Sequence, residues 1–348
     1  MKSEERLSNF ELLRILAMYA IILHHLVVHG IFSQDMQLTN TINNIFLISV
    51  AIGGKFGVNI FILISGYFLI NQSFRISKFL KILWQYFFYS VFILIIVSFF
   101  HIICIDLNTL IITLFPLTGF SWFADLYILL YLFFPFLNVM LNNLTHFQYI
   151  LFLKLGFLIW FGIPTIASFF EVPISMNFSN VVWFSYLYSV GAFIKIHENE
   201  IQLKNPGKIA IYSYLLYIFI SIFSFSNFHF LIFLISEKNF LILISSICTF
   251  LFFKTCVFRN WKIINKIAAT VFGVYLLHDN SLTRDFLWNK LLNIKVHYDE
   301  FGFIAYALGT SFLILITCIL IDLCRITIEN YISERYLQKK IFSHKEKY

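Results

Sequence analysis

Stretches of about twenty apolar residues recur along the whole chain, and they restrict its fold more than any other feature of the sequence. A membrane-spanning α-helix needs about 20 consecutive, mostly apolar residues to cross a hydrocarbon core of about 30 Å. The 348 residues are 60% hydrophobic and only 12% charged, against about 25% charged in a soluble globular domain. We therefore expect an all-α, polytopic membrane protein without a soluble domain of useful size.

Hydropathy divides the chain into ten predicted spans within one membrane domain, residues 1–348. Segments 107–117 and 227–236 are apolar but too short to cross, so we expect them at the membrane interface. The adjacent glycines Gly53-Gly54 interrupt the second span, which predicts a bent or two-part helix. The predicted spans are 11–32, 45–71, 79–104, 120–142, 148–170, 179–197, 208–226, 239–257, 265–288 and 302–328.

The distribution of positive charge predicts how these spans are oriented, because cytoplasmic loops of membrane proteins are rich in Lys and Arg. With a cytoplasmic N-terminus, nineteen of the 25 Lys and Arg residues lie at cytoplasmic ends and four lie on the outer side. We expect both termini to be cytoplasmic in a multi-pass protein of the cell membrane, embedded in the lipid bilayer. The basic residues are scattered between helices, which argues against nucleic acid as a partner.

Costly ionisable residues interrupt the first span. Glu11 and Arg14 precede an apolar run that contains His24, His25 and His29. Ionisable groups at membrane depth are expensive, so they are functional candidates by default. Arg14 and His25 are almost three helical turns apart, so they share one helix face with a rise of about 16 Å between them. The sequence thus predicts an arginine at the membrane surface in line with a reactive histidine near the midplane.

Each of these groups also has a more ordinary interpretation. Ser8 with Glu11 fits a capping box, whereas Glu11 would alternatively pair with Arg14 one turn later. Arg14 would also serve as a positive-inside anchor at the membrane surface. We expect His24 to be a satisfied structural histidine that faces the bundle interior, and His25 to accept protons near neutral pH.

Metal binding is the weaker interpretation of the histidines. His25 and His29 are four residues apart, but no acidic helper lies between them and no third ligand can be named, so no metal is expected. The five cysteines lie in or near apolar segments, where we expect small buried side chains and no disulfide or metal framework. They are Cys104, Cys248, Cys256, Cys318 and Cys324.

A basic cluster stands at the start of the third span. It consists of Arg75, Lys78 and Lys81, with the two lysines one turn apart on one helix face. One interpretation is ordinary positive-inside charge. The other is an anion site, formed together with Arg14, for phosphates that arrive from the cytoplasm.

Polar groups in two later spans are further candidates. Trp122 and Asp125 lie at the start of the fourth span, where a tryptophan would otherwise belong to the aromatic belt. Tyr275, His278 and Asp279 lie within the predicted ninth span. A His–Asp pair is rare in lipid-facing sequence, so we expect it to face a cavity.

Taken in order, these motifs resemble a known family. Glu11-x-x-Arg14 followed by ten residues and His25 is similar to the N-terminal signature of the acyltransferase 3 family of integral membrane acyltransferases. The resemblance covers about residues 8–328. Three softer motifs agree with it: Gly57-Val-Asn-Ile-Phe…Ser65-Gly66-Tyr67, Trp122-Phe…Tyr131…Pro135 and Phe272-Gly-Val-Tyr275-Leu-Leu-His278.

The resemblance implies transfer of an acyl group, usually acetyl from cytoplasmic acetyl-CoA, to a hydroxyl of a bacterial cell-surface or secreted glycan. Acyl-CoA would be the donor substrate, no cofactor would be bound permanently, and a glycan or lipid-linked sugar would be the acceptor. The family often has Arg-x-x-Arg where this chain has Lys78-x-x-Lys81, which keeps the charge and loses the bidentate fork. Many relatives carry a C-terminal extracytoplasmic esterase-like domain, which we expect this chain to lack.

The resulting hypothesis gives each group a role. Glu11 orients Arg14, and Arg14 with the basic cluster contacts the phosphates of acyl-CoA. His25 acts as general base or as a transient acyl-imidazole, with His278 as a further catalytic candidate. Acetyl and succinyl donors both remain open. The acceptor side would include Trp122, Asp125, Tyr275 and Asp279.

A different class of protein also fits the intramembrane histidines. A transporter or flippase would use them as a proton relay. Many transporters show internal repeat halves, and this sequence shows none, so the enzyme is the favoured interpretation.

Overall fold

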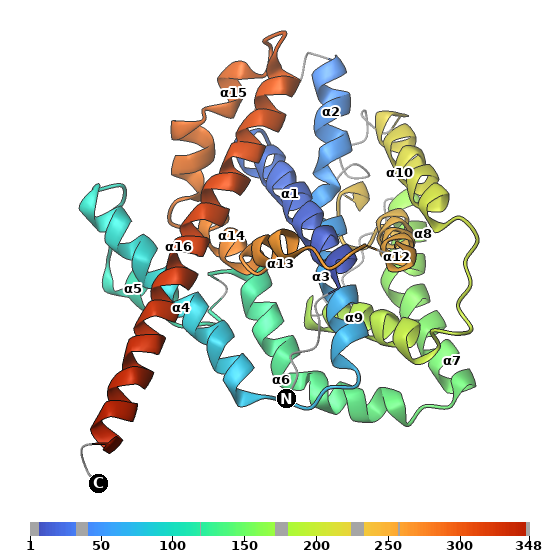
Figure 1. The fold of residues 1–348 in the computed structure, drawn as a ribbon. Coiled ribbons are helices and arrows are strands. Elements are labelled where there is room, and N and C mark those ends of the chain that lie inside the picture. The colour runs from blue at the N-terminus through green and yellow to red at the C-terminus, as the bar shows by residue number, and fades with distance from the viewer. Residues whose placement is uncertain are drawn as a thin grey trace.

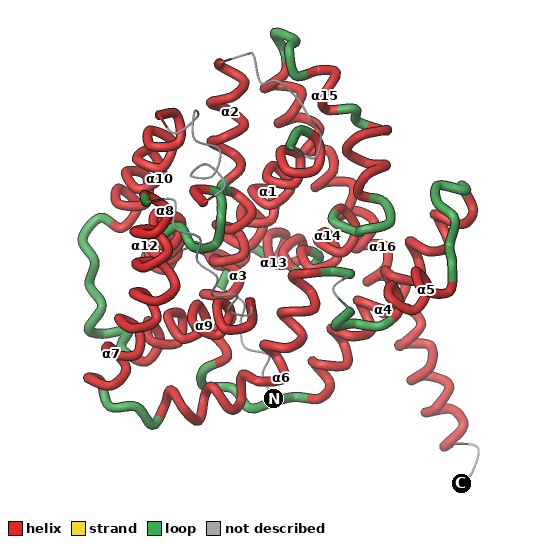
Figure 2. Tube along the Cα trace, turned by 180° about the vertical axis from the view of Figure 1, so that it is seen from behind, coloured by secondary structure: helices red, strands yellow, loops and turns green. Residues whose placement is uncertain are grey.

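Every regular element that the structure, a computed structural model, describes is helical (Figures 1 and 2), which confirms the all-α prediction. The described residues are 7–32, 41–118, 120–170, 180–223, 233–256 and 258–345. The elements are α1 (Ser8–Gly30), α2 (Thr41–Ala51), α3 (Gly53–Leu69), α4 (Ile76–Phe99), α5 (Leu107–Leu114), α6 (Trp122–Asn142), α7 (His146–Phe157), η1 (Leu158–Gly162), α8 (Ile163–Phe169), α9 (Asn180–Ile196), α10 (Pro206–Phe223), α12 (Phe240–Thr255), α13 (Lys262–Ala268), α14 (Val271–His278), η2 (Phe286–Leu291), α15 (Ile294–His297) and α16 (Phe303–Lys345).

Among the described residues, seven helical stretches are long and apolar enough to cross a membrane, so the chain is a multi-pass membrane protein. α9 and α12, which lie in the predicted spans 179–197 and 239–257, are shorter, at 17 and 16 residues. The total of ten spans and the cytoplasmic position of both termini stay predictions. The seven stretches are Ser8–Gly30, Ile42–Leu69, Ile76–Phe99, Trp122–Asn142, His146–Phe169, Pro206–Phe223 and Phe303–Ser333.

The predicted ninth span, 265–288, is not one continuous helix. α13 ends in a turn that Thr270 closes, because both its backbone N–H and its hydroxyl donate to the carbonyl of Ile267. α14 then runs only as far as His278, and the π-helical segment η2 follows after a further turn. A hydropathy window of about twenty residues averages over these breaks, although the turn after His278 contains the polar residues Asp279, Asn280 and Arg284. The consequence is a short helix whose last residue is a buried histidine.

The predicted bend in the second span is confirmed, because α2 ends at Ala51 and α3 begins at Gly53. α3 crosses α1 closely at this point: a Cβ on Gly53 would overlap the carbonyl of Ala20. Gly57, one turn later, faces the Ala17 carbonyl of α1 in the same way. Small residues at helix interfaces allow this close approach in membrane proteins. The contact fixes α1 against α3 in the middle of the bundle (Figure 1).

α3 packs on its other side against α9 through a reciprocal pair of glycines. Gly66 of α3 lies against the carbonyl of Tyr188, and Gly191 of α9 lies against the carbonyl of Leu63. Neither position has room for a Cβ without movement of a backbone. α1, α3 and α9 therefore form the rigid centre on which the site is built.

The reciprocal contact makes a stability prediction. Gly191→Ala should destabilise the protein by about 1–3 kcal/mol, the usual effect of overpacking a well-packed core. The measurement is the midpoint of thermal unfolding in detergent. Gly309→Ala in α16 is the matched control, since nothing lies within 4 Å of a Cβ built there. Equal midpoints for the two variants would contradict the packing.

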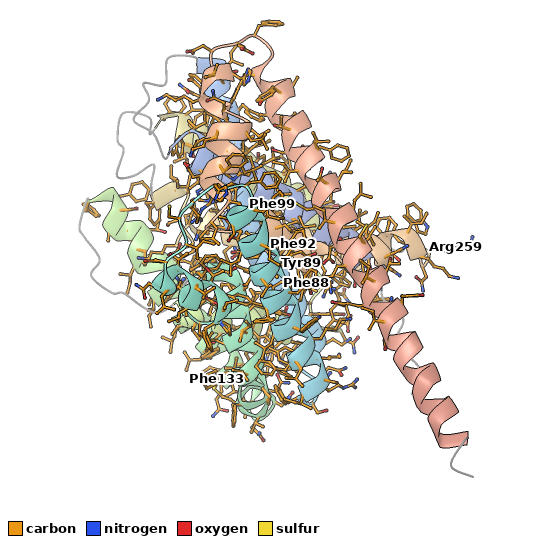
Figure 3. The ribbon with its side chains drawn as sticks, turned by 90° about the vertical axis from the view of Figure 1, so that its left-hand side faces the viewer. Phe88, Tyr89, Phe92, Phe99, Phe133 and Arg259 are labelled. Carbon is orange, nitrogen blue, oxygen red and sulfur yellow. The ribbon has the colours of Figure 1, made fainter. Side chains whose placement is uncertain are left out.

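A buried ionic cluster fixes α16 to α4, and Figure 3 shows Tyr89 of α4 beside this helix. Asp322, which is fully buried, accepts hydrogen bonds from the Tyr89 hydroxyl at 2.5 Å and from Arg325 Nε at 2.7 Å. Arg325 is only 5% exposed and also donates to Glu329 at 2.8 Å. Gly273 of α14 leaves the space that the Asp322 carboxylate occupies. The cluster thus also fixes the position of α14.

Candidate active site

His25 of the first span contacts His278 of the predicted ninth span. α1 and α14 cross so that His25 Nδ1 lies 3.0 Å from His278 Nε2. His278 Nδ1 lies 2.7 Å from the carbonyl of Val274, and a carbonyl accepts only, so this nitrogen carries a proton. In the neutral pair, His278 Nε2 then accepts and His25 Nδ1 donates, by assignment from hydrogen-bond chemistry. The remaining nitrogen, His25 Nε2, is left with a free lone pair.

A carboxylate lies beside that lone pair. His25 Nε2 is 3.7 Å from Asp279 Oδ2, and the Asp279 side chain is only 10% exposed. The other carboxylate oxygen lies 3.4 Å from His29 Nε2 and 3.4 Å from Arg284 Nη1. A buried carboxylate stays ionised only when it is paired, and Arg284 supplies the permanent positive charge. A proton placed on His25 Nε2 would therefore be stabilised by an adjacent anion.

These groups line a cavity of about 180 Å³. Its walls include His25, Asp279, Trp122, Tyr275 and Lys55. The Tyr275 hydroxyl accepts from the backbone N–H of residue 123 at 3.2 Å, which holds α14 against the start of α6. Of the predicted His–Asp pair, Asp279 lines this cavity and His278 does not, and the cavity joins residues that lie far apart in the sequence.

Asp125 does not line this cavity, although the sequence analysis grouped it with the acceptor side. Its carboxylate accepts from the backbone N–H of Leu117 at 2.9 Å. Leu117 has a φ of 70°, a conformation that costs free energy in a residue other than glycine. Asp125 therefore stabilises the turn that leads into α6.

A larger cavity, of about 320 Å³, lies on another face of α1. Ala20 and Leu23 of α1, Phe56 of α3 and Tyr214 of α10 are among its lining residues. Among the described residues no carboxylate, imidazole or cation lines it, so the smaller cavity is the candidate site.

His24 lines the 180 Å³ cavity, but it also makes the hydrogen bond expected of a structural histidine. Its Nδ1 lies 2.5 Å from the carbonyl of Ala51, so the ring donates to the end of α2. The same ring packs against Gly54, where a Cβ would overlap it. His24 thus helps to hold the bend between α2 and α3.

Three side chains of the site are close enough to share a metal ion. Ligand atoms of His25, His29 and Asp279 lie within 4.8 Å of one another, and Asp279 is the third ligand that the sequence did not reveal. Arg284 already contacts the same carboxylate, and its positive charge would repel a metal cation bound there. The absence of a metal therefore stays a prediction, with a specific charge arrangement in its favour.

The start of α1 carries the predicted ion pair but not the capping box. Arg14 Nη1 donates to Glu11 Oε1 at 2.9 Å, and Glu11 is buried while the Arg14 side chain is 30% exposed. Ser8 is already helical and caps nothing in α1. Its hydroxyl accepts from the backbone N–H of Trp261 at 2.8 Å and donates to Asn265 at 3.0 Å. The capping-box interpretation is wrong because Ser8 joins α1 to α13.

The basic cluster lies where the sequence places it, at the beginning of α4. Arg75 precedes the helix, Lys78 and Lys81 lie in its first turns, and all three are exposed. Within the described part of the chain, no hydrogen bond or ion pair connects them with Glu11 or Arg14. Their convergence with Arg14 on one anion stays a prediction.

Tyr67, the last residue of the second-span motif, has a partner in the loop after α9. Its hydroxyl donates to Glu198 at 2.7 Å. Lys195 and Lys254 lie 2.8 Å and 3.2 Å from the same carboxylate. Partial burial by itself would raise the pKa of Glu198. The hydrogen bonds and the neighbouring positive charges outweigh that effect and lower the pKa to about 2. This ion cluster joins the ends of α3, α9 and α12.

The lowered pKa makes stability depend on pH. A carboxyl whose pKa falls from 4.5 to about 2 on folding stabilises the fold above pH 4.5, and this contribution is lost as the pH falls toward 2. Glu198→Gln should therefore lower the unfolding midpoint at pH 7, with a gap that narrows between pH 4.5 and 2. The exposed Asp285→Asn should leave the midpoint nearly unchanged throughout. A pH-independent gap would contradict the assignment.

Two residues of the site, Arg284 and Lys55, were not singled out from the sequence, and the pairing of His29 with Asp279 was not foreseen. His29 and Arg284 pair with Asp279, and Lys55 lies in the cavity wall. Lys55 carried the same signal as His25, a costly ionisable group within an apolar stretch. Arg284 resembled ordinary loop charge, so only the fold reveals its partner.

The membrane helices place an imidazole, a carboxylate and a cation around one cavity, with His278 in contact with the first imidazole, and such a set of groups suits a membrane enzyme. Comparison with family models identifies which class. The family described as "Acyltransferase domain" matches residues 7–323, nearly the whole chain. The chain belongs to this family and is a membrane acyltransferase. No curated protein and no solved structure matches it.

Proposed function

We propose that the protein transfers an acetyl group from cytoplasmic acetyl-CoA to a hydroxyl of a glycan or lipid-linked sugar at the cell surface. The observation that carries this proposal is the position of His25, which lines a cavity with its Nε2 3.7 Å from Asp279 Oδ2. Family membership supports an acyltransferase over the transporter considered above. The setting is the cell membrane of a bacterium, and acetyl-CoA is a substrate, with no permanently bound cofactor.

His25 acts as the general base of the transfer. Its Nε2 takes the proton of the acceptor hydroxyl as the oxygen attacks the thioester carbonyl. The imidazolium that forms lies 3.7 Å from Asp279, which stabilises its charge. His278 holds His25 in the productive tautomer through the 3.0 Å hydrogen bond and is a positioning residue. Its role corresponds to that of the orienting group in other acid–base sites.

The acyl-imidazole role of His25 uses the same Nε2 atom, so kinetics must separate the two mechanisms. A general base requires both substrates bound together and gives sequential kinetics. A covalent acyl-histidine gives ping-pong kinetics and a burst of CoA before the acceptor is added.

The donor is bound at the opposite end of α1 from the cavity. Arg14, held by Glu11, lies about 16 Å along the helix from His25, at the end that charge bias assigns to the cytoplasm. The exposed lysines Lys78 and Lys81, with Arg75, contribute further positive charge to this face. The phosphates of CoA would meet these cations while the thioester extends toward the cavity. The acceptor sugar would enter beside Trp122 and Tyr275.

The role of His25 is tested by His25→Ala. Loss of a general base typically reduces the rate by about 10²–10⁴-fold. We expect the purified variant to lose CoA release from acetyl-CoA with a panel of methyl glycosides, and expressing cells to lose O-acetyl signals in proton NMR of their surface polysaccharide. His146→Ala is the matched control, because that histidine is 52% exposed at the start of α7. Activity retained by His25→Ala would refute the mechanism, and the same panel with succinyl-CoA identifies the acyl group.

The donor site is tested by the double variant Lys78→Gln/Lys81→Gln. A hydrogen bond to a charged group is worth about 1.5–3 kcal/mol, so we expect KM for acetyl-CoA to rise by about tenfold or more with kcat nearly unchanged. Acetyl-pantetheine, which has no phosphates, should be used equally well by the variant and the wild type. An unchanged KM for acetyl-CoA would mean that these lysines are ordinary positive-inside charge.

A further inference from the structure

Lys55 places a positive charge in the wall of the same cavity as His25. It lies in the first turn of α3, and its Nζ is 4.5 Å from the centre of the Trp122 ring. Trp183 provides a second aromatic face at 5.5 Å, and Glu237 an ion pair at 3.3 Å. The side chains of Lys55 and Glu237 are each only 22% exposed.

A lysine in this position is expensive, so it calls for a reason. Burying an ammonium group within a bundle of membrane helices is costly even when a carboxylate pairs with it. Two indole rings and one carboxylate reduce that cost. An apolar residue with a neutral partner at position 237 would avoid the cost altogether, so the ion pair by itself does not account for Lys55.

Acyl transfer to a hydroxyl forms a negatively charged intermediate that the neutral histidines do not stabilise. When the hydroxyl oxygen bonds to the thioester carbon, the carbonyl electron pair moves to oxygen and forms an oxyanion. Stabilising that charge requires a cation or hydrogen-bond donors directed at it. His25 and Asp279 manage the proton, and a carboxylate would repel the oxyanion.

The cavity wall contains two permanent cations, Lys55 and Arg284. Arg284 is directed at Asp279 Oδ1 and at the Ser281 hydroxyl, at 3.4 Å and 3.5 Å. Lys55 has three N–H donors and one carboxylate partner, so donors remain for a ligand. On the basis of the proposed function, we propose that Lys55 binds the carbonyl oxygen of the acyl group and stabilises the oxyanion of the tetrahedral intermediate.

The complete step then balances. The acceptor oxygen forms a bond to the carbonyl carbon, its proton moves to His25 Nε2, and the carbonyl electrons move onto the oxygen that faces Lys55. When the intermediate collapses, those electrons re-form the carbonyl and the carbon–sulfur bond breaks. The CoA thiolate leaves and takes the proton back from His25. The products are an ester and CoA thiol, and Lys55 remains protonated throughout.

Two variants test the assignment while controlling for the ion pair. Lys55→Met removes the cation, and Lys55→Met/Glu237→Gln also removes the charge that would be left unpaired. Removing one oxyanion contact costs about 10²–10³-fold in kcat, so we expect that loss in both variants, with KM for acetyl-CoA little changed. Lys154→Met is the matched control, because it removes an exposed lysine of α7 that lies away from the cavity.

The assay measures CoA release from acetyl-CoA with the methyl glycoside panel, on detergent-purified protein whose thermal unfolding midpoint is recorded in parallel. In one contrary outcome, the double variant retains a kcat near the wild-type value while His25→Ala still abolishes activity. That result would overturn the role of Lys55 and leave the proposed function in place. Recovery of activity on adding Glu237→Gln to Lys55→Met would show that Lys55 only neutralises Glu237. Wild-type protein that transfers no acyl group, although it is folded, would instead refute the proposed function.

Discussion

The cost of placing charge among apolar helices governs this structure. An ionised group in such surroundings must be paired or face a cavity. Asp279 meets this requirement through Arg284 and His29, and Asp322 through Arg325. The pair of Asp279 with His29 joins the turn after α14 to α1, and the Tyr89 hydroxyl joins Asp322 to α4, so these buried charges help to hold helices together. The candidate site is the cluster around Asp279, where we assign a free lone pair to His25 Nε2.

Much of α1 could be predicted from the sequence because helix periodicity alone determines which of its residues share a face. The alignment of Arg14 with His25 and the pairing of Arg14 with Glu11 depend on nothing outside that helix. The contact of His25 with His278 could not be predicted, because periodicity gives the direction of a side chain and not the identity of the neighbouring helix. Ser8 illustrates the same limit: its local pattern suits a cap, but a backbone amide 253 residues later competes successfully for its hydroxyl.

The largest difference between expectation and structure, the division of the predicted ninth span, is also where the proposed chemistry lies. A continuous helix over 265–288 would have carried His278 and Asp279 on different faces of one rod. Ending α14 at His278 directs the histidine at α1 and lets Asp279, in the following turn, approach the far side of the same imidazole. Two adjacent residues thereby contact opposite nitrogens of one ring. Hydropathy averages over such a break, whereas the site depends on it.

The contact between His25 and His278 spans 253 residues of sequence. The imidazole of His25 in α1 therefore has no contact with His278 until α14 has been synthesised and packed against it. Contacts of such long sequence separation form late and slowly, because the loop between them must close first. Under the proposed function, a chain that ends before α14 would lack the group that orients His25, so catalytic activity would depend on assembly of the helix bundle.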